Sequence, residues 1–198
     1  MSDVLSEEAP VRTSPMKLAQ VGDYSVSNWG DQLYPGVTAH LLRRIGLEAD
    51  IEHFAPLAGT TLDGEPIRTL REIRRTEATA VLVGGGDLVR FDTTTVALDH
   101  MAVPEAQRHG HLLHLRAKLF ARRHFLAGPG VWLPEEDWVP GAATVLVSVG
   151  ARRMAHDARA RAAVSRVKGV WVRTAHAAQQ FEAAGVDADR IVRAPDMI

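Results

Sequence analysis

The chain has 198 residues, of which 46% are hydrophobic and 24% charged, and its formal net charge is −1 at pH 7. This composition is ordinary for a folded globular protein, and 23 basic residues against 24 acidic ones predict no bulk electrostatic binding to nucleic acid or acidic membranes. The absence of cysteine excludes disulfides, thiolate metal sites and a cysteine nucleophile. No apolar run approaches the roughly 20 residues of a membrane-spanning helix.

The amino-terminal segment, residues 1–15, is acidic and then polar. It lacks the basic and apolar regions of a signal peptide, which predicts a cytoplasmic protein with a disordered leader. The length suits one well-packed domain, and we expect a single Rossmann-like α/β domain over residues 16–198.

Short apolar runs alternate with helical patterns beyond Pro15. This alternation predicts a mainly parallel sheet with helices on both faces. The predicted strands cover residues 16–21, 49–54, 80–83, 144–149, 169–172 and 190–192. The predicted helices cover residues 31–45, 66–75, 105–123, 154–167 and 174–184. The loop 128–142, rich in Pro, Gly and Trp, is expected to cover part of the fold.

Three polar loops follow predicted strands, and ligands of open parallel sheets bind beyond the carboxyl ends of strands. The first loop, residues 22–31, leads into a helix amino terminus, which favours anions. Gly30 lets the backbone approach a ligand and Trp29 could stack on a sugar ring. Asn28 and Asp31 could bind sugar hydroxyls, or they could only cap the helix. The loop lacks the G-x-G-x-x-G pattern and the chain lacks a phosphate-loop Gly-Lys-Ser/Thr, which disfavours NAD and ATP.

The second loop begins with Gly84, Gly85 and Gly86, directly after a buried strand. Consecutive glycines cost backbone entropy, so they are expected where a tight turn or a nearby ligand leaves no room for side chains. Asp87 could contact a hydroxyl or act as a base. The alternative is a plain strand-to-helix turn.

The third loop contains Arg173 and His176. Arg173 ends a predicted strand, where its guanidinium could bind a carboxylate or phosphate in bidentate fashion, or form a surface ion pair. His176 is the histidine nearest the presumed cleft and could donate a proton.

Five histidines lie between residues 100 and 124, at positions His100, His109, His111, His114 and His124. Two of them, three residues apart on one helical face, could in principle hold a metal. A carboxylate partner at matching spacing and the H-E-x-x-H pattern are missing. We therefore predict surface or half-buried histidines and no metal site.

Four segments in order resemble the amino-terminal half of the polysaccharide pyruvyltransferase family. They are residues 22–31, the strand with three glycines at 81–86, the strand ending in a glycine turn at 145–150, and 170–173 followed by Gly185 and Pro195-Asp196. The resemblance implies one half of a B-type glycosyltransferase fold, with the active cleft between two halves. Its members transfer a pyruvyl group from phosphoenolpyruvate to saccharide hydroxyls, as a ketal, in the synthesis of cell-surface polysaccharides or exopolysaccharides.

The resemblance implies phosphoenolpyruvate as donor substrate, no cofactor, and a saccharide or glycan intermediate as acceptor. Arg173 and the first-loop amides would neutralise the phosphate and carboxylate, and a histidine would protonate the enol carbon. The sequence departs from the family at Thr174 and Ala177, where an acidic residue and a serine are usual. The family's carboxyl-terminal domain is also missing from this sequence.

Three interpretations therefore remain. The chain is a pyruvyltransferase half, which could pair with another subunit or with itself. It could also be a glycosyltransferase-like domain that uses a nucleotide-sugar, or a non-catalytic saccharide-binding subunit.

Overall fold

The computed structural model describes residues 15–24, 28–84, 93–108, 110–150 and 156–194. Most of the predicted leader and the residues Gly85, Gly86 and Asp87 lie outside the described residues, as do Pro195 and Asp196.

One sheet of eight strands organises the fold, in the order β3-β4-β2-β1-β5-β6-β7-β8. The strands are β1 (Met16–Val21), β2 (Ala49–Ala55), β3 (Gly59–Thr60), β4 (Pro66–Thr69), β5 (Ala80–Gly84), β6 (Ala143–Val149), β7 (Gly169–Val172) and β8 (Ile191–Arg193). Every neighbouring pair is parallel except the β3–β4 hairpin. The chain winds outward from β1 in one direction and then from β5 in the other, so the topological switch point lies between β1 and β5. The predicted Rossmann-like α/β fold is confirmed.

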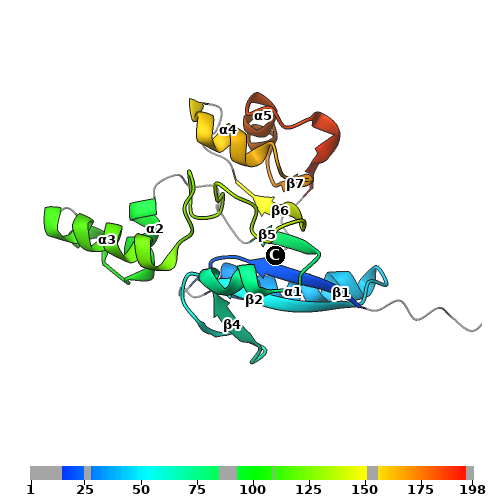
Figure 1. Cartoon of the computed structure of the whole chain (residues 1–198), viewed down its shortest axis with the longest axis horizontal. Helices are drawn as coiled ribbons and strands as arrows, with labels where there is room; N and C mark the ends of the chain where they lie inside the picture. Colours follow the sequence, from blue (N-terminus) through cyan, green and yellow to red (C-terminus); the bar gives the residue numbers. More distant parts are fainter. Residues whose placement is uncertain (1–14, 25–27, 85–92, 109, 151–155, 195–198) are drawn as a thin grey trace, which may run out of the picture.

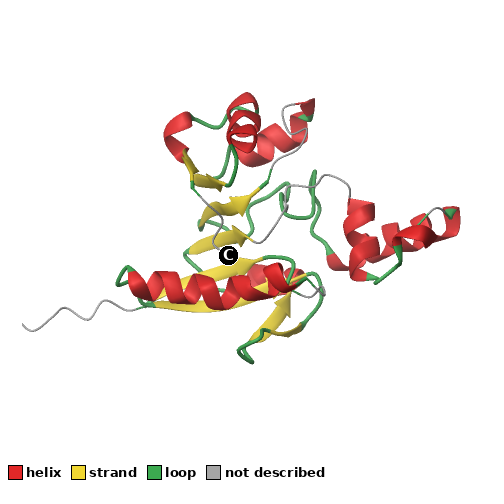
Figure 2. Cartoon of the chain, turned by 180° about the vertical axis from the view of Figure 1, so that it is seen from behind, coloured by secondary structure: helices red, strands yellow, loops and turns green. Residues whose placement is uncertain are grey.

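The helices are α1 (Trp29–Arg44), α2 (Thr93–His100), α3 (His111–His124), α4 (Ala158–Val164) and α5 (Ala175–Ala183), with 3₁₀ turns η1 (Leu70–Arg75), η2 (Glu105–Gln107) and η4 (Ala188–Arg190). Figure 1 shows α1 behind the strands, and Figure 2, from the opposite side, shows it in front. In both views α2 and α3 project away from the sheet at one side. No helix in the described part of the chain is long and apolar enough to cross a membrane.

The core follows from the two-residue period of the strands. In β1, Ala19 and Val21 belong to the main hydrophobic cluster, together with Val81 and Val83 of β5. The alternate residue Gln20 is also buried, and it contacts α1 by donating to the Thr38 hydroxyl oxygen at 2.8 Å. The central strands are therefore covered on both faces where α1 passes, as their nearly continuous apolar sequence predicts.

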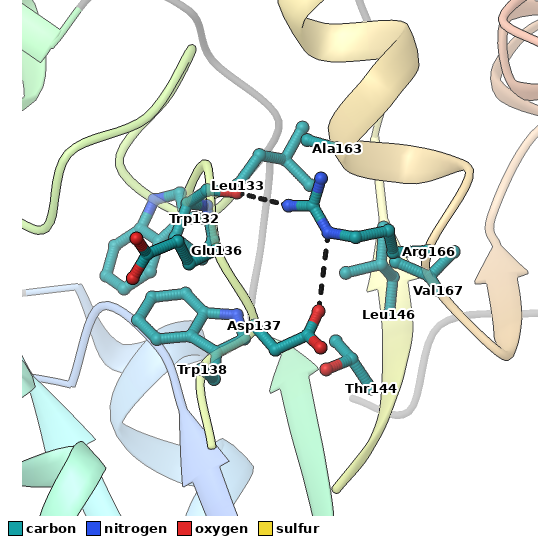
Figure 3. Close-up of a pocket in the computed structure, with 11 residues that line it drawn as sticks. Trp132, Leu133, Glu136, Asp137, Trp138, Thr144, Leu146, Ala163, Arg166 and Val167 are labelled. Carbon is teal, nitrogen blue, oxygen red and sulfur yellow. Dashed lines mark hydrogen bonds and ion pairs between the residues drawn. The ribbon is translucent and has the colours of Figure 1, made fainter. Parts of the chain in front are cut away.

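The loop 128–142 covers part of the main cluster, as the sequence predicted, because Trp132 and Trp138 are only 2% and 1% exposed. Arg166, just after α4, holds this loop: its guanidinium donates to the Pro134 carbonyl oxygen at 2.7 Å and pairs with Asp137 at 3.3 Å. Figure 3 shows the Arg166 guanidinium facing the Asp137 carboxylate, with a dashed line for the ion pair. The space left among these side chains is about 20 Å³, room for about one water molecule, so we interpret this pocket as packing.

Two predicted helices are wrong in part. Residues 66–75 begin as strand β4, paired with β2, and only the second half is helical, as η1. Thr69 starts η1 with a capping box to Glu72, which fixes the change from strand to helix. The predicted helix 105–123 is divided into η2 and α3, with Gly110 as the residue that precedes α3.

Helix α2 was not predicted, and α4 is shorter than the predicted 154–167. Helix α4 begins after Asp157, whose carboxylate caps it by accepting hydrogen bonds from the backbone N–H groups of Arg159 and Ala160.

Candidate functional site

The ends of β1 and β5 touch at the switch point. A Cβ placed on Gly22 would lie 2.4 Å from the Gly84 carbonyl oxygen and 2.4 Å from the Tyr24 ring. The buried Tyr24 hydroxyl points to the same oxygen at 3.5 Å, and burial raises the pKa of this hydroxyl well above its usual value. The first loop, which follows β1, and the second loop, which begins at Gly84, therefore meet. Close packing requires glycine at position 22.

The amino terminus of α1 is capped from within. The Asn28 side-chain oxygen accepts from the Gly30 backbone N–H at 3.1 Å, and its amide donates to the Asp31 carboxylate at 2.7 Å. Asp31 is 7% exposed, whereas Trp29 is 71% exposed. Asn28 thus caps α1. A carboxylate in the first turn also supplies the negative charge that a helix amino terminus favours, which makes this position less suited to a second anion.

A buried Asp–His pair, which sequence reasoning missed, lies beside the first loop. Asp23 lies two residues beyond the end of β1, and its carboxylate oxygen lies 3.0 Å from the Nε2 atom of His100 at the end of α2. The His100 side chain is fully buried, in contrast to the predicted surface or half-buried position. Its ring stacks on Phe120 with centroids 6.2 Å apart and meets Phe125 edge-on at 6.0 Å. The pair therefore ties α2 to the carboxyl end of β1.

Strand β6 ends in an irregularity of its pairing with β7. The register between β6 and β7 shifts between Leu146 and Val149, and the fully buried Ser148 has φ of 55°. A non-glycine residue in this region stores backbone strain, and such bulges are frequent next to functional sites. This strain has no signature in the sequence, because a serine inside an apolar run is compatible with a regular strand.

The third loop leads from β7 into α5. Arg173 is half-buried and interacts within the protein, and His176 is exposed in the first turn of α5. The Thr174 hydroxyl caps this helix by accepting from the Ala177 backbone N–H at 3.1 Å. Thr174 and Ala177, the two positions at which the sequence departs from the pyruvyltransferase pattern, thus together form the cap of α5.

The three loops and the end of β6 lie at the same edge of the sheet, but they are not all in contact. β1, β5, β6 and β7 are consecutive parallel strands, so their carboxyl ends lie side by side. Three strand spacings separate β1 from β7, which is about 14 Å. The Asn28–Asp31 cap lies at the β1 end of this row of carboxyl ends, and Arg173 lies at the β7 end. The distance between them is long enough for two small ligands to bind side by side.

A groove of about 490 Å³ adjoins this edge, between α1 and the face of β5–β7 that α1 leaves uncovered. Its lining is largely apolar and comprises Gln20, Tyr34, Thr38, Leu41, Leu42, Arg44, Ile45, Leu82, Gly84, Val147 and Trp171. The buried Oε1 atom of Gln20 has no hydrogen-bond partner among the described residues. Trp171 of β7 is half-buried here and donates its ring N–H to the Ala194 carbonyl oxygen at 3.3 Å.

No group of three or more His, Asp or Glu side chains that could hold a metal ion gathers within the described ranges. His111 and His114, the pair with helical spacing, are both exposed on α3.

No family model matches the chain, and no curated protein matches it. Among solved structures, a lipopolysaccharide outer core galactosyltransferase, WaaB in its apo form, aligns at 11% identity with a TM-score of 0.42. The alignment covers 89% of this chain and 44% of that chain, so this chain spans less than half the length of that enzyme. The fold assignment rests on the strand order.

Proposed function

We propose that the chain is part of a transferase that moves a pyruvyl group from phosphoenolpyruvate to saccharide hydroxyls, in the synthesis of a cell-surface polysaccharide or exopolysaccharide. One observation supports this most. The four segments that resemble the pyruvyltransferases are scattered along the sequence, yet they include or directly follow the carboxyl ends of four consecutive strands, β1, β5, β6 and β7. Ligands of doubly wound sheets bind at this edge.

The reaction sets three demands on such an edge. The methylene carbon of phosphoenolpyruvate takes up a proton, and one acceptor hydroxyl oxygen bonds to the neighbouring carbon. A second hydroxyl then displaces the phosphate, so that the products are the ketal and inorganic phosphate. The site must neutralise a carboxylate and a phosphate, supply the proton, and hold the two hydroxyls nearby.

The charges along the edge suggest where each ligand binds. Arg173 at the end of β7 is suited to the donor carboxylate or phosphate, and His176, exposed in the next helical turn, to the donation of a proton. The α1 end is suited to the saccharide, because Asp31 already occupies the anion position and Trp29 exposes an aromatic ring. The expected roles of Gly84, Gly85 and Gly86 in substrate binding, and of Asp87 as a base or a contact to a hydroxyl, stay part of this proposal.

Calorimetric titration of the purified chain with phosphoenolpyruvate tests the assignment, with a uridine-diphosphate sugar as the competing ligand. We expect saturable binding of phosphoenolpyruvate, weakened about ten- to a hundred-fold by Arg173→Gln, because hydrogen bonds to charged groups are the strong ones. Arg193→Gln is the matched control, since Arg193 is exposed at the end of the neighbouring strand β8.

The other outcomes identify the alternatives. Binding of the nucleotide-sugar without phosphoenolpyruvate would favour a glycosyltransferase-like domain. Binding of neither, with saccharide binding retained, would favour a non-catalytic saccharide-binding subunit.

A further inference from the structure

Helix α3 exposes a stripe of leucines. Leu112, Leu115 and Leu119 are 72%, 54% and 56% exposed. Their spacing of three and four residues places them on one side of the helix. The opposite side packs inward through Ala117, which is fully buried, and through Phe120. Helix α3 therefore has two apolar sides. One packs in the core, and the other, the leucine stripe, is exposed.

Basic side chains border the leucine stripe on both sides. By the 3.6-residue repeat, Arg116 and Arg123 lie along one border, and Lys118 and Arg122 along the other. All four are exposed, and none forms an ion pair with a residue in the described part of the chain. Residues 111–124 contain no Asp or Glu, although the whole chain has a net charge of −1. Helix α3 is therefore positively charged, although acidic and basic residues nearly balance in the chain as a whole.

The position of α3 leaves this stripe accessible. Figures 1 and 2 both show α2 and α3 projecting beyond the sheet, with α3 outermost. The helix is held in place at its carboxyl end, where the Arg71 guanidinium in η1 donates to the backbone carbonyl oxygens of Arg122 and Arg123. The stripe is therefore presented by an anchored helix rather than by a free segment.

We infer that α3 docks in the plane of an anionic lipid bilayer. Leucines with cations on both borders are the pattern of an interfacial helix, whose apolar side enters the headgroup boundary while Lys and Arg reach lipid phosphates. At about 21 Å the helix is shorter than the ~30 Å hydrocarbon core, so it lies on the surface. A second copy of the chain is disfavoured as the occupant, because symmetric pairing of α3 would bring four cations against four others.

Vesicle flotation of the purified chain tests this inference. We expect binding to vesicles of equal phosphatidylglycerol and phosphatidylcholine, little binding to pure phosphatidylcholine, and loss of binding in high salt. Each cation near an anionic surface strengthens binding about five-fold, so Arg116→Gln with Lys118→Gln should weaken it roughly thirty-fold. Leu115→Asn with Leu119→Asn should remove most of the binding.

Matched controls are available elsewhere on the surface. Leu62→Asn replaces a leucine that is 51% exposed after β3, and Arg43→Gln with Arg44→Gln removes two exposed cations at the end of α1. Both controls should bind as the unchanged chain does. Equal binding to neutral vesicles, no vesicle binding, or equal losses in the controls would each overturn the inference. Self-association that Leu115→Asn with Leu119→Asn abolishes, without vesicle binding, would show that a second copy covers the stripe.

Discussion

The contact between the ends of β1 and β5 can be tested by adding one methyl group. In Gly22→Ala the new Cβ would meet the Gly84 carbonyl oxygen and the Tyr24 ring, each at 2.4 Å. Either β1 and β5 separate at the switch point or Tyr24 leaves its buried position. Overpacking of this kind costs about 1–3 kcal/mol, and for a chain of this size each kcal/mol lowers Tm by roughly 2–4 °C. We therefore expect Tm to fall by about 2–12 °C.

Two other glycines give a graded series. A Cβ on Gly84 would lie 3.1 Å from the Val147 carbonyl oxygen, a smaller overlap, and a Cβ on Gly59 would meet nothing within 4 Å. The loss of stability, measured by thermal unfolding, should decrease in the order Gly22→Ala, Gly84→Ala, Gly59→Ala. The last should be within about 0.5 kcal/mol of the unchanged chain. If Gly22→Ala were as stable as Gly59→Ala, the inferred contact between the two strand ends would be refuted.

Two further predictions concern buried histidines. Burial lowers the pKa of His53 below its usual value near 6.5, so below that pH the unfolded chain binds more protons than the folded chain. The free energy of unfolding should therefore fall as the pH drops below about 6.5. Urea unfolding at pH 7.5 and 5.5 should show a smaller decrease of this free energy in His53→Asn than in the unchanged chain. His100→Leu should cost about 1–3 kcal/mol because it leaves the Asp23 carboxylate, 18% exposed, without the imidazole beside it. Adding Asp23→Ala should recover part of that loss in chemical unfolding, and strictly additive losses would argue against the pair.

The central sheet could be predicted because its sequence and its environment agree. Residues 80–83 are all apolar, and residues 144–149 are apolar except for Thr144 and Ser148. These two runs form β5 and β6, neighbouring strands near the centre of a parallel sheet. Residues 66–75 were ambiguous, because Ile67, Leu70 and Ile73 are spaced three apart and all three are buried. The spacing suits a helix, but pairing with β2 makes the first part of this segment a strand, and tertiary contacts outweigh local preference there.

The candidate site was predictable only where it depends on strand ends. The loops after β1, β5 and β7 were found because an apolar run followed by glycine or polar residues marks such an end. The Asp23–His100 pair was not found, because it depends on α2 returning to the end of β1, and α2 itself was missed. The strain at Ser148 was missed for a similar reason, since a bulge is set by how neighbouring strands pair.

The distribution of charge along the carboxyl edge bears on how two ligands would share it. Asp23 and Asp31 lie at the β1 end, whereas Arg173 and His176 lie at the β7 end, about 14 Å away. A donor with a carboxylate and a phosphate would be repelled from the first pair and attracted to the second. Neutral hydroxyls tolerate the acidic end and can donate hydrogen bonds to carboxylates there. The proposed transfer would therefore proceed with the saccharide over α1 and the donor over β7, and the two would meet near β5 and β6.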